Sequence, residues 1–151
     1  MFIAHDEGGG ERDKWWFAKG DGVLHFHVND GVPSAYLAQT PFTPELDRWY
    51  HLAVKREGDT FIVFIDGSPG NSEDYSHGLP NAATPLTIGE AETFVFNGGS
   101  LDDIAIYDRA LTDLEIASVA AGYAIPEPVG MASLLTALAA LAGYVRKRRR
   151  A

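Results

Sequence analysis

The fold is decided by residues 48–67, which read RWYHLAVKREGDTFIVFIDG. Residues 48–55 alternate as a half-buried strand does, with Tyr50, Leu52 and Val54 on one face. Residues 60–65 form a second run of apolar, β-branched and aromatic side chains. Because a tight turn at 57–59 separates the two runs, the sequence predicts an antiparallel β-hairpin here.

Further short strands are expected on both sides of this hairpin. They are predicted at residues 23–28, 36–38, 85–88, 93–96 and 101–107, separated by Gly, Pro, Asn and Asp. Many short strands with turn residues at this spacing are typical of an antiparallel sandwich and not of an α/β fold. The stretch 68–80 is polar and irregular, and we expect it to be a long connection.

One helix is predicted after these strands. Thr112 and Glu115 have the spacing of a capping box, in which each side chain accepts a hydrogen bond from the backbone amide of the other residue. The helix should run from Asp113 to about Ala121, and Gly122 suits the left-handed position that often follows a last turn.

Four blocks of the sequence resemble, in order and spacing, the landmarks of laminin G-like, concanavalin A-like domains. The blocks are WYHLAV at 49–54, FIVFIDG at 61–67, LTIG at 86–89 and LDDIAIYDRAL at 101–111. The resemblance spans residues 15–120 and implies an all-β fold, a two-sheet antiparallel jelly-roll sandwich, for a domain of residues 1–121. Members of that family usually have additional strands before the position where this chain begins. The resemblance therefore also implies an N-terminally incomplete sandwich with an unpaired sheet edge.

An uncharged segment, residues 129–145, follows the domain, and five consecutive basic residues follow at 146–150. As a helix rising ~1.5 Å per residue, this segment spans about 25 Å, close to a thin hydrocarbon core. Basic clusters that follow a hydrophobic span stay on the cytoplasmic side of the membrane. The sequence thus predicts a linker at 122–128, a single transmembrane helix at 129–145 and a basic cytoplasmic tail at 146–151, with the domain outside.

The same region resembles the PEP-CTERM sorting signal of Gram-negative bacteria. The resemblance rests on a Leu- and Ala-rich helix that begins at Ser133, on a Pro-Glu-Pro triplet and on terminal arginines, namely Pro126, Glu127, Pro128, Arg146, Arg148, Arg149 and Arg150. It implies cleavage by an exosortase, a membrane transpeptidase-like enzyme, so that the inner membrane is a transit location before the cell envelope or the exterior. An ordinary C-terminal anchor fits the span and the charges equally but leaves the triplet unexplained.

Composition narrows the possible partners. The chain contains 21 Asp and Glu against 12 Lys and Arg, a formal charge of −9, and five of its basic residues lie in the tail. Because so acidic a domain repels phosphate backbones, we expect no nucleic-acid partner.

The chain has no cysteine, which excludes disulfides and thiolate metal sites. Residues 1–10 contain no export signal, so we expect that the chain lacks its true beginning.

The sequence predicts no catalytic residues. Acid–base hydrolysis of sugars needs two carboxylates that face one substrate across ~5 to 9.5 Å. Laminarinase-type relatives in the wider fold have a Glu-x-Asp-x-x-Glu pattern, which this chain lacks. Glu45 with Asp47, and Glu90 with Glu92, are each two residues apart, but both pairs fall in expected loops. No nucleophile elbow for a serine triad is visible. We therefore predict that the protein is not an enzyme.

Aromatic side chains are the candidates for sugar binding, because pyranose rings present apolar C–H patches beside their hydroxyls. The possible platforms are Trp15, Trp16, Tyr36, Trp49 and Tyr75. We predict ligand contacts at Trp15 and Trp16, since one of two adjacent rings must face away from the other. We also predict them at Tyr75, in the polar stretch 68–80. The alternative is that both tryptophans are buried against the sheets.

Asp102 and Asp103 match the acidic pair with which related laminin G-like domains bind calcium at the sandwich rim. Alternation along a strand places Asp102 on the face of Ile104 and Ile106, where an unpaired carboxylate is costly. A structural calcium ion at Asp102 and Asp103 is one reading. Hydrogen bonds from backbone amides of the neighbouring turn are the other.

His25 and His27 are expected on one face of a strand and could in principle bind zinc with His5 and Asp6. Histidines that alternate with an aromatic residue are more often the wetter face of a strand. We therefore predict no zinc site.

Together these features predict an exported, non-catalytic module that binds extracellular polysaccharide or matrix and is sorted by an exosortase. One alternative is a structural or adhesive envelope protein that binds other proteins. The other is the remnant of a glycoside hydrolase whose catalytic strands were lost with the N-terminus. The fold does not choose among these.

Overall fold

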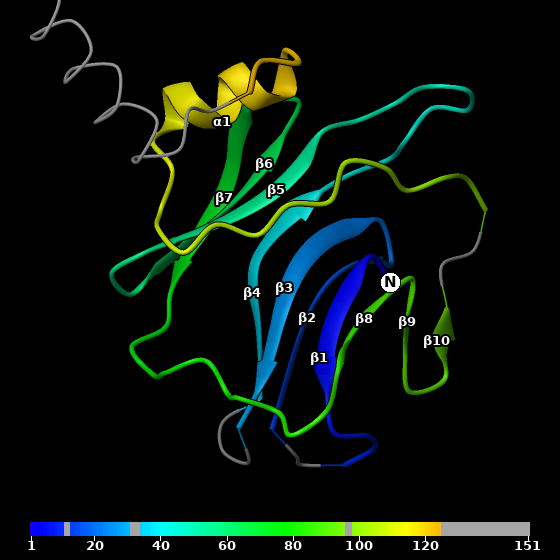
Figure 1. Ribbon diagram of the computed structural model, residues 1–151, viewed down its shortest axis with the longest axis vertical. Helices are drawn as coiled ribbons and strands as arrows, with labels where there is room; N and C mark the ends of the chain where they lie inside the picture. Colours follow the sequence, from blue (N-terminus) through cyan, green and yellow to red (C-terminus); the bar gives the residue numbers. More distant parts are fainter. Residues whose placement is uncertain (11–12, 31–33, 96–97, 125–151) are drawn as a thin grey trace, which may run out of the picture.

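The computed structural model describes residues 1–10, 13–30, 34–95 and 98–124. Two antiparallel sheets pack face to face, and one helix lies on the outside of the smaller sheet (Figure 1). The predicted all-β sandwich with a short helix is confirmed.

The larger sheet has five antiparallel strands. Their order across the sheet is β4 (Ala35–Pro41), β3 (Val23–Asn29), β2 (Lys14–Gly20), β1 (Ile3–Asp6) and β8 (Leu86–Ile88). The strands predicted at 23–28, 36–38 and 85–88 all lie in this sheet. A register shift between β3 and β4 coincides with a left-handed backbone at Ala38 (φ +51°).

The predicted hairpin forms the smaller sheet, which has the order β5 (Leu52–Glu57), β6 (Thr60–Ile65) and β7 (Ser68–Asp74). Glu57 pairs with Thr60 across a two-residue turn. The strand begins at Leu52 and not at Arg48, because the amide of His51 donates to the side chain of Asp66 (2.9 Å). The amide of Asp66 donates a hydrogen bond to the carbonyl oxygen of His51 (2.8 Å).

Two expectations about the later chain were wrong. Residues 68–74, expected to be a connection, form β7, because backbone pairing with β6 does not require apolar side chains. Residues 101–107, expected to be a strand, are not one: they have no regular secondary structure, the backbone of Asp103 is left-handed (φ +51°), and nearly all of their side chains are exposed. A small ribbon of β9 (Glu90–Ala91) and β10 (Phe94–Val95) lies between these two regions.

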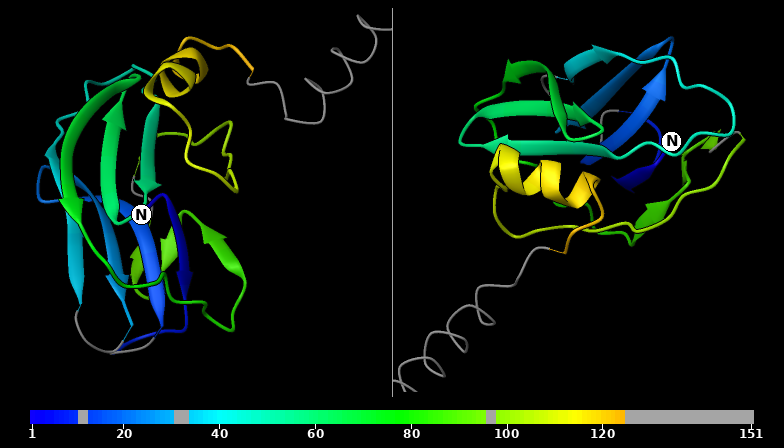
Figure 2. Two further views of the ribbon diagram at one scale, coloured as in Figure 1. Left: turned by 90° about the vertical axis from the view of Figure 1, so that its left-hand side faces the viewer. Right: turned by 90° about the horizontal axis from the view of Figure 1, so that it is seen from above.

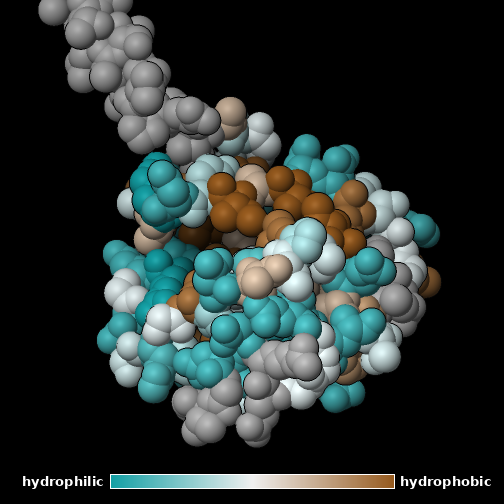
Figure 3. Space-filling view, turned by 60° about the horizontal axis from the view of Figure 1, so that its bottom comes forward, coloured by the Kyte–Doolittle hydropathy of each residue, from teal (hydrophilic) through white to brown (hydrophobic). Residues whose placement is uncertain are grey.

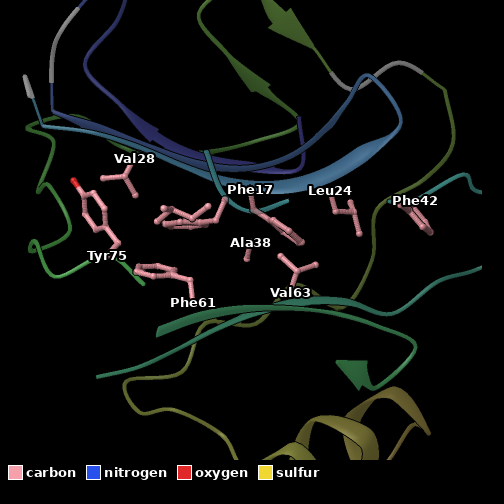
Figure 4. Packing of buried hydrophobic residues seen from close by; sticks show 10 residues of the cluster. Phe17, Leu24, Val28, Ala38, Phe42, Phe61, Val63 and Tyr75 are labelled. Atoms are coloured by element: carbon pink, nitrogen blue, oxygen red, sulfur yellow. The ribbon is translucent and has the colours of Figure 1, made fainter. Parts of the chain in front are cut away.

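The core fills the space between the sheets (Figure 4). Phe17, Leu24 and Val28 point from the large sheet toward Phe61 and Val63 on β6. Rings stack across the gap, and the centroids of Phe26 and Phe61 are 5.3 Å apart. Burying large apolar side chains of this kind contributes about 1.5 to 3 kcal/mol each.

The helix α1 (Asp113–Ala120) packs on the outer face of the small sheet, where Ile116 and Leu111 cover Phe64. The predicted capping box at Thr112 and Glu115 is confirmed. A hydrogen bond of 2.6 Å from Lys55 on β5 to Asp113 fixes the start of the helix to the sheet and raises the pKa of Lys55.

The linker beyond residue 124, the transmembrane helix, the sorting motif and the basic tail fall outside the described residues. Within residues 1–10, 13–30, 34–95 and 98–124, no helix is long and apolar enough to cross a membrane.

Gly67 provides a test of the helix contact. A Cβ at this position would lie 2.8 Å from the Cα of Ala117, and the backbone of Gly67 is left-handed (φ +76°). Gly67→Ala should lower the free energy of unfolding by about 2 to 4 kcal/mol, through backbone strain and displacement of α1. Urea denaturation followed by circular dichroism measures this loss.

The matched control is Gly58→Ala. Gly58 is also left-handed (φ +61°), but a Cβ there would meet nothing within 4 Å. It should therefore cost only about 1 kcal/mol of backbone strain. Equal losses for the two variants would contradict a close contact between Gly67 and α1.

Candidate binding face

The outer face of the large sheet carries a row of side chains defined by strand register. Ala4 on β1 lies opposite Trp16 on β2, Trp16 opposite His27 on β3, and His27 opposite Tyr36 on β4. Residues paired in this way share one face of a sheet. Since Phe17 and Phe26 of the same strands point into the core, this row points away from it.

The rings of this row pack on one another. The centroids of Trp16 and His27 are 4.0 Å apart in stacked geometry, and those of His27 and Tyr36 are 4.5 Å apart. His25 meets the edge of Tyr36 at 5.0 Å. Trp16, His25 and His27 are buried, whereas Tyr36 is 50% exposed. Tyr36 is therefore the ring of this group that a ligand can reach. We call Trp16, His25, His27 and Tyr36 the aromatic row.

A buried lysine lies at one end of the aromatic row. The ammonium of Lys14 forms ion pairs with Asp6 (3.6 Å) and with Glu92, and it donates to the carbonyl oxygen of Gly8 (2.7 Å). It also lies 5.7 Å from the ring centroid of Trp16. Charge neutralisation of this kind is what allows a lysine to be buried. The contacts also connect β2 to the turn that precedes β10.

The environment keeps the two histidines of the row neutral. Burial is the largest cause of the lowered pKa of His27, which falls to about 4, and the charges of His25 and Lys14 add to it. Burial likewise lowers the pKa of His25. Both imidazoles are therefore uncharged at neutral pH and can pack against aromatic rings.

The three residues predicted to bind ligand do not come together. Trp16 lies in the aromatic row, but Trp15 faces inward and stacks on Phe26 at 5.6 Å. Tyr75 is also buried in the core, with its ring 6.3 Å from Phe61. Adjacent residues on a strand point to opposite faces, which explains why the tryptophans separate.

Tyr36 and Trp49, two of the other possible platforms, are both exposed. The alternation of His25 and His27 with core residues is the sequence signal that marks the outer face. The pairing of Tyr36 with His27 depends on strand register, which no local pattern gives.

Asp102 and Asp103 are adjacent and exposed, and the amide of Asp103 donates to the side chain of Asp102 (2.9 Å). The expectation that Asp102 shares a buried face with Ile104 and Ile106 is wrong, because residues 101–107 are not a strand. Among the described residues, no group of three potential metal ligands gathers here or elsewhere. A calcium ion at this pair stays a prediction.

The buried histidine pair predicts a pH dependence of stability. The pKa of His27 is about 4 in the folded protein and 6.5 in an unfolded chain, so the unfolded state binds more protons between these values. The free energy of unfolding should therefore be highest above pH 6.5, and it should fall by roughly 2 kcal/mol as the pH drops toward 4. Urea titrations at pH 7 and pH 4.5 measure this difference.

Two variants test whether His27 causes this pH dependence of stability. His27→Gln should flatten the dependence between pH 7 and 4.5, whereas His77→Gln, at an exposed position, should leave it as in the wild type. An unchanged slope in His27→Gln would contradict the assignment.

Comparisons with known proteins bear on the fold and the family. A crystal structure of residues 221–444 of an S-layer domain-containing protein from Clostridium thermocellum is similar with 20% identity and a TM-score of 0.43. The match covers 78% of this chain and 60% of that one. None of the curated proteins compared with the chain matches it. The family model of the concanavalin A-like lectin/glucanases superfamily, Laminin_G_3, matches residues 1–117. The chain therefore belongs to this superfamily.

Proposed function

We propose that the domain is a non-catalytic carbohydrate-binding module of the cell envelope. The single observation that carries the proposal is the half-exposed ring of Tyr36, held on the outer face of the large sheet by His25 and His27. Sugar rings stack on such faces through their C–H patches. Because the ring is already braced by its neighbours, little side-chain freedom is lost when a ligand binds.

The proposal that the module is not catalytic is supported by the state of the carboxylates near this face. Asp6 and Glu92 both contact the ammonium of Lys14. The side chains of Asp6 and Glu92 are 6% and 20% exposed, so both carboxylates are engaged within the protein rather than turned toward a substrate. The carboxylate of Glu45, one of the acidic residues in a loop, lies 3.8 Å from the guanidinium of Arg48.

The proposed location rests on the sequence of residues 126–150. In this proposal the inner membrane holds the chain in transit with the domain outside, and an exosortase then releases it to the envelope or to extracellular polysaccharide. The domain's acidic composition agrees with a role away from nucleic acids.

Substitution of Tyr36 tests the binding face. Tyr36→Ala should raise the Kd for a bound polysaccharide about tenfold, which corresponds to about 1.4 kcal/mol, because the stacking face is removed. Tyr36→Phe should keep most of the affinity. Affinity electrophoresis against a panel of bacterial exopolysaccharides measures the change, with calcium and with chelator because of the prediction at Asp102 and Asp103.

The control is Tyr123→Ala, which removes another exposed tyrosine outside the aromatic row. Its affinity should equal that of the wild type. If no polysaccharide retains the wild type, or if both alanine variants bind alike, Tyr36 does not form a sugar-binding face.

Processing is tested by the mass of the mature protein. Intact-mass measurement on protein recovered from cells should show the loss of everything after the region of Pro126, Glu127 and Pro128. Changing the triplet to Ala-Ala-Ala should leave the full-length form in the membrane. A full-length wild-type protein found in the cytosol would contradict both the export and the sorting.

A further inference from the structure

A second half-exposed ring lies next to the aromatic row. The ring centroid of Phe94 on β10 is 6.3 Å from that of Trp16, in tilted geometry, and Phe94 is 54% exposed. Trp16 in turn stacks on His27, and His27 packs on Tyr36. The buried pair Trp16 and His27 therefore lies between two half-exposed rings, Phe94 at one end and Tyr36 at the other.

Phe94 faces the large sheet because of the way in which β9 and β10 pair. Ala91 on β9 is buried against Ala4 and Trp16, which belong to the outer face of that sheet. Phe94 is the cross-strand partner of Ala91, so the two side chains share one face of the ribbon. The ribbon lies on the side of the large sheet that faces away from the small sheet (Figure 2, right view). Phe94 and Tyr36 are therefore presented on the same side of the domain.

Two polar contacts hold this ribbon in place. Glu92, in the turn between β9 and β10, forms an ion pair with the buried ammonium of Lys14. The hydroxyl of Thr87 on β8 donates a hydrogen bond to the carbonyl oxygen of Glu90 on β9 (2.7 Å). Because the ribbon is fixed at its start and at its turn, Phe94 loses little freedom when a ligand stacks on it.

The two exposed rings are separated by the width of several strands. The aromatic row crosses β2, β3 and β4 through residues that lie opposite one another, and neighbouring strands in a sheet are ~4.8 Å apart. One pyranose unit of a linear polysaccharide advances the chain by about one such spacing. A linear chain that crosses the strands therefore places about one sugar unit on each strand, and about four units reach from Tyr36 on β4 to Phe94 beyond β2.

The basic side chains of the domain favour an uncharged ligand. Acidic sugars are held most strongly by free guanidinium or ammonium groups. Lys19 is the cross-strand partner of Leu24, a core residue, so it does not share the face of Tyr36. Within the described ranges, every other lysine and arginine forms an ion pair with a carboxylate, namely Lys14, Arg48, Lys55, Arg56 and Arg109. The face of Tyr36 therefore offers no unpaired cation from the described part of the chain.

The negative charge of the domain also disfavours a polyanion. Two carboxylates, of Asp6 and Glu92, share the single ammonium of Lys14 beside Trp16. Hydrophilic residues cover much of the face seen in Figure 3, and acidic residues outnumber basic ones in the chain by 21 to 12. A polysaccharide with negative charges along its length would be repelled by such a domain, whereas an uncharged chain would not.

We propose that the module binds an internal stretch of a linear, uncharged polysaccharide, about four sugar units long, which crosses the strands from Tyr36 to Phe94. The two rings stack on the C–H faces of non-adjacent units, and the units between them lie over the buried pair Trp16 and His27. This inference rests on the carbohydrate-binding function proposed above. It adds a second contact residue, a ligand length and a ligand charge.

Affinity electrophoresis with uncharged and acidic polymers tests the charge of the ligand. The full chain is kept in a zwitterionic detergent without a sugar headgroup, so that the detergent does not occupy the site. At least one of three uncharged polymers, namely hydroxyethyl cellulose, linear β-1,3-glucan and glucomannan, should slow its migration. Alginate, polygalacturonate and hyaluronan, whose sugar units carry carboxylates, should not.

Oligosaccharides of two to six units, prepared from the uncharged polymer that slows migration, test the length of the site. In isothermal titration calorimetry, the Kd should fall at least tenfold from the dimer to the tetramer, because the tetramer reaches both rings. From the tetramer to the hexamer, the Kd should change less than twofold.

Variants of Phe94 test the second ring. Phe94→Ala should raise the Kd of the tetramer about tenfold and leave that of the dimer within twofold, because the dimer still has Tyr36. Phe94→Leu should cause the same loss, since it keeps apolar packing on Trp16 without a flat ring, and it keeps the test valid if Phe94→Ala disturbs the ribbon. Phe94→Tyr should bind as the wild type does. Leu114→Ala is the matched control, because this leucine is 81% exposed on α1, across the core from the aromatic row.

The outcomes distinguish this inference from the proposed function. If no polymer of either set slows migration, both are contradicted. If an acidic polymer slows it, the ligand is not uncharged, and loss of that binding in Tyr36→Ala would show that the sugar-binding function still stands. A Kd that does not depend on length, or that is equal for the tetramer in Phe94→Ala and Leu114→Ala, would contradict the contact at Phe94 and leave Tyr36 as the binding residue.

Discussion

The unequal width of the two packed sheets is the constraint on which the other features depend. In the part of the chain that the structure describes, burial of aromatic and aliphatic side chains holds three strands against five. Because β6 and β7 lie over β3 and β4, the core is complete on that side and thins toward β1 and β8. The same packing turns the alternate residues of β2 and β3 outward, which creates the aromatic row. The binding face is therefore a consequence of how the core packs.

Local sequence patterns predicted the elements whose stabilising contacts join residues close together in the chain. The hairpin at Gly58 and the capped helix at Thr112 each depend on residues a few positions apart, and both were predicted. The segment 101–107 has the composition of a strand, but a strand needs a partner, and pairing is not a local property. Residues 68–74 show the converse, because a polar stretch became a strand through the neighbouring β6.

The candidate site was less predictable than the fold. Alternation indicated that His25 and His27 share a face, but the neighbours of that face come from β2 and β4 through register. A shift of one residue would have exchanged Tyr36 for Leu37 on the outer face. The sequence could name Trp15 and Trp16 as opposed rings, yet it could not say which of them faced the core. Only Trp16 joined the aromatic row, and it is buried there beneath its neighbours.

The position of α1 has a consequence for orientation. The helix lies on the outside of the small sheet, and the aromatic row lies on the outside of the large one, so the sandwich core separates them. The described chain thus reaches residue 124 at the back of the domain relative to Tyr36. A tether attached there would leave the face that carries Tyr36 free to meet material on the side away from the attachment point.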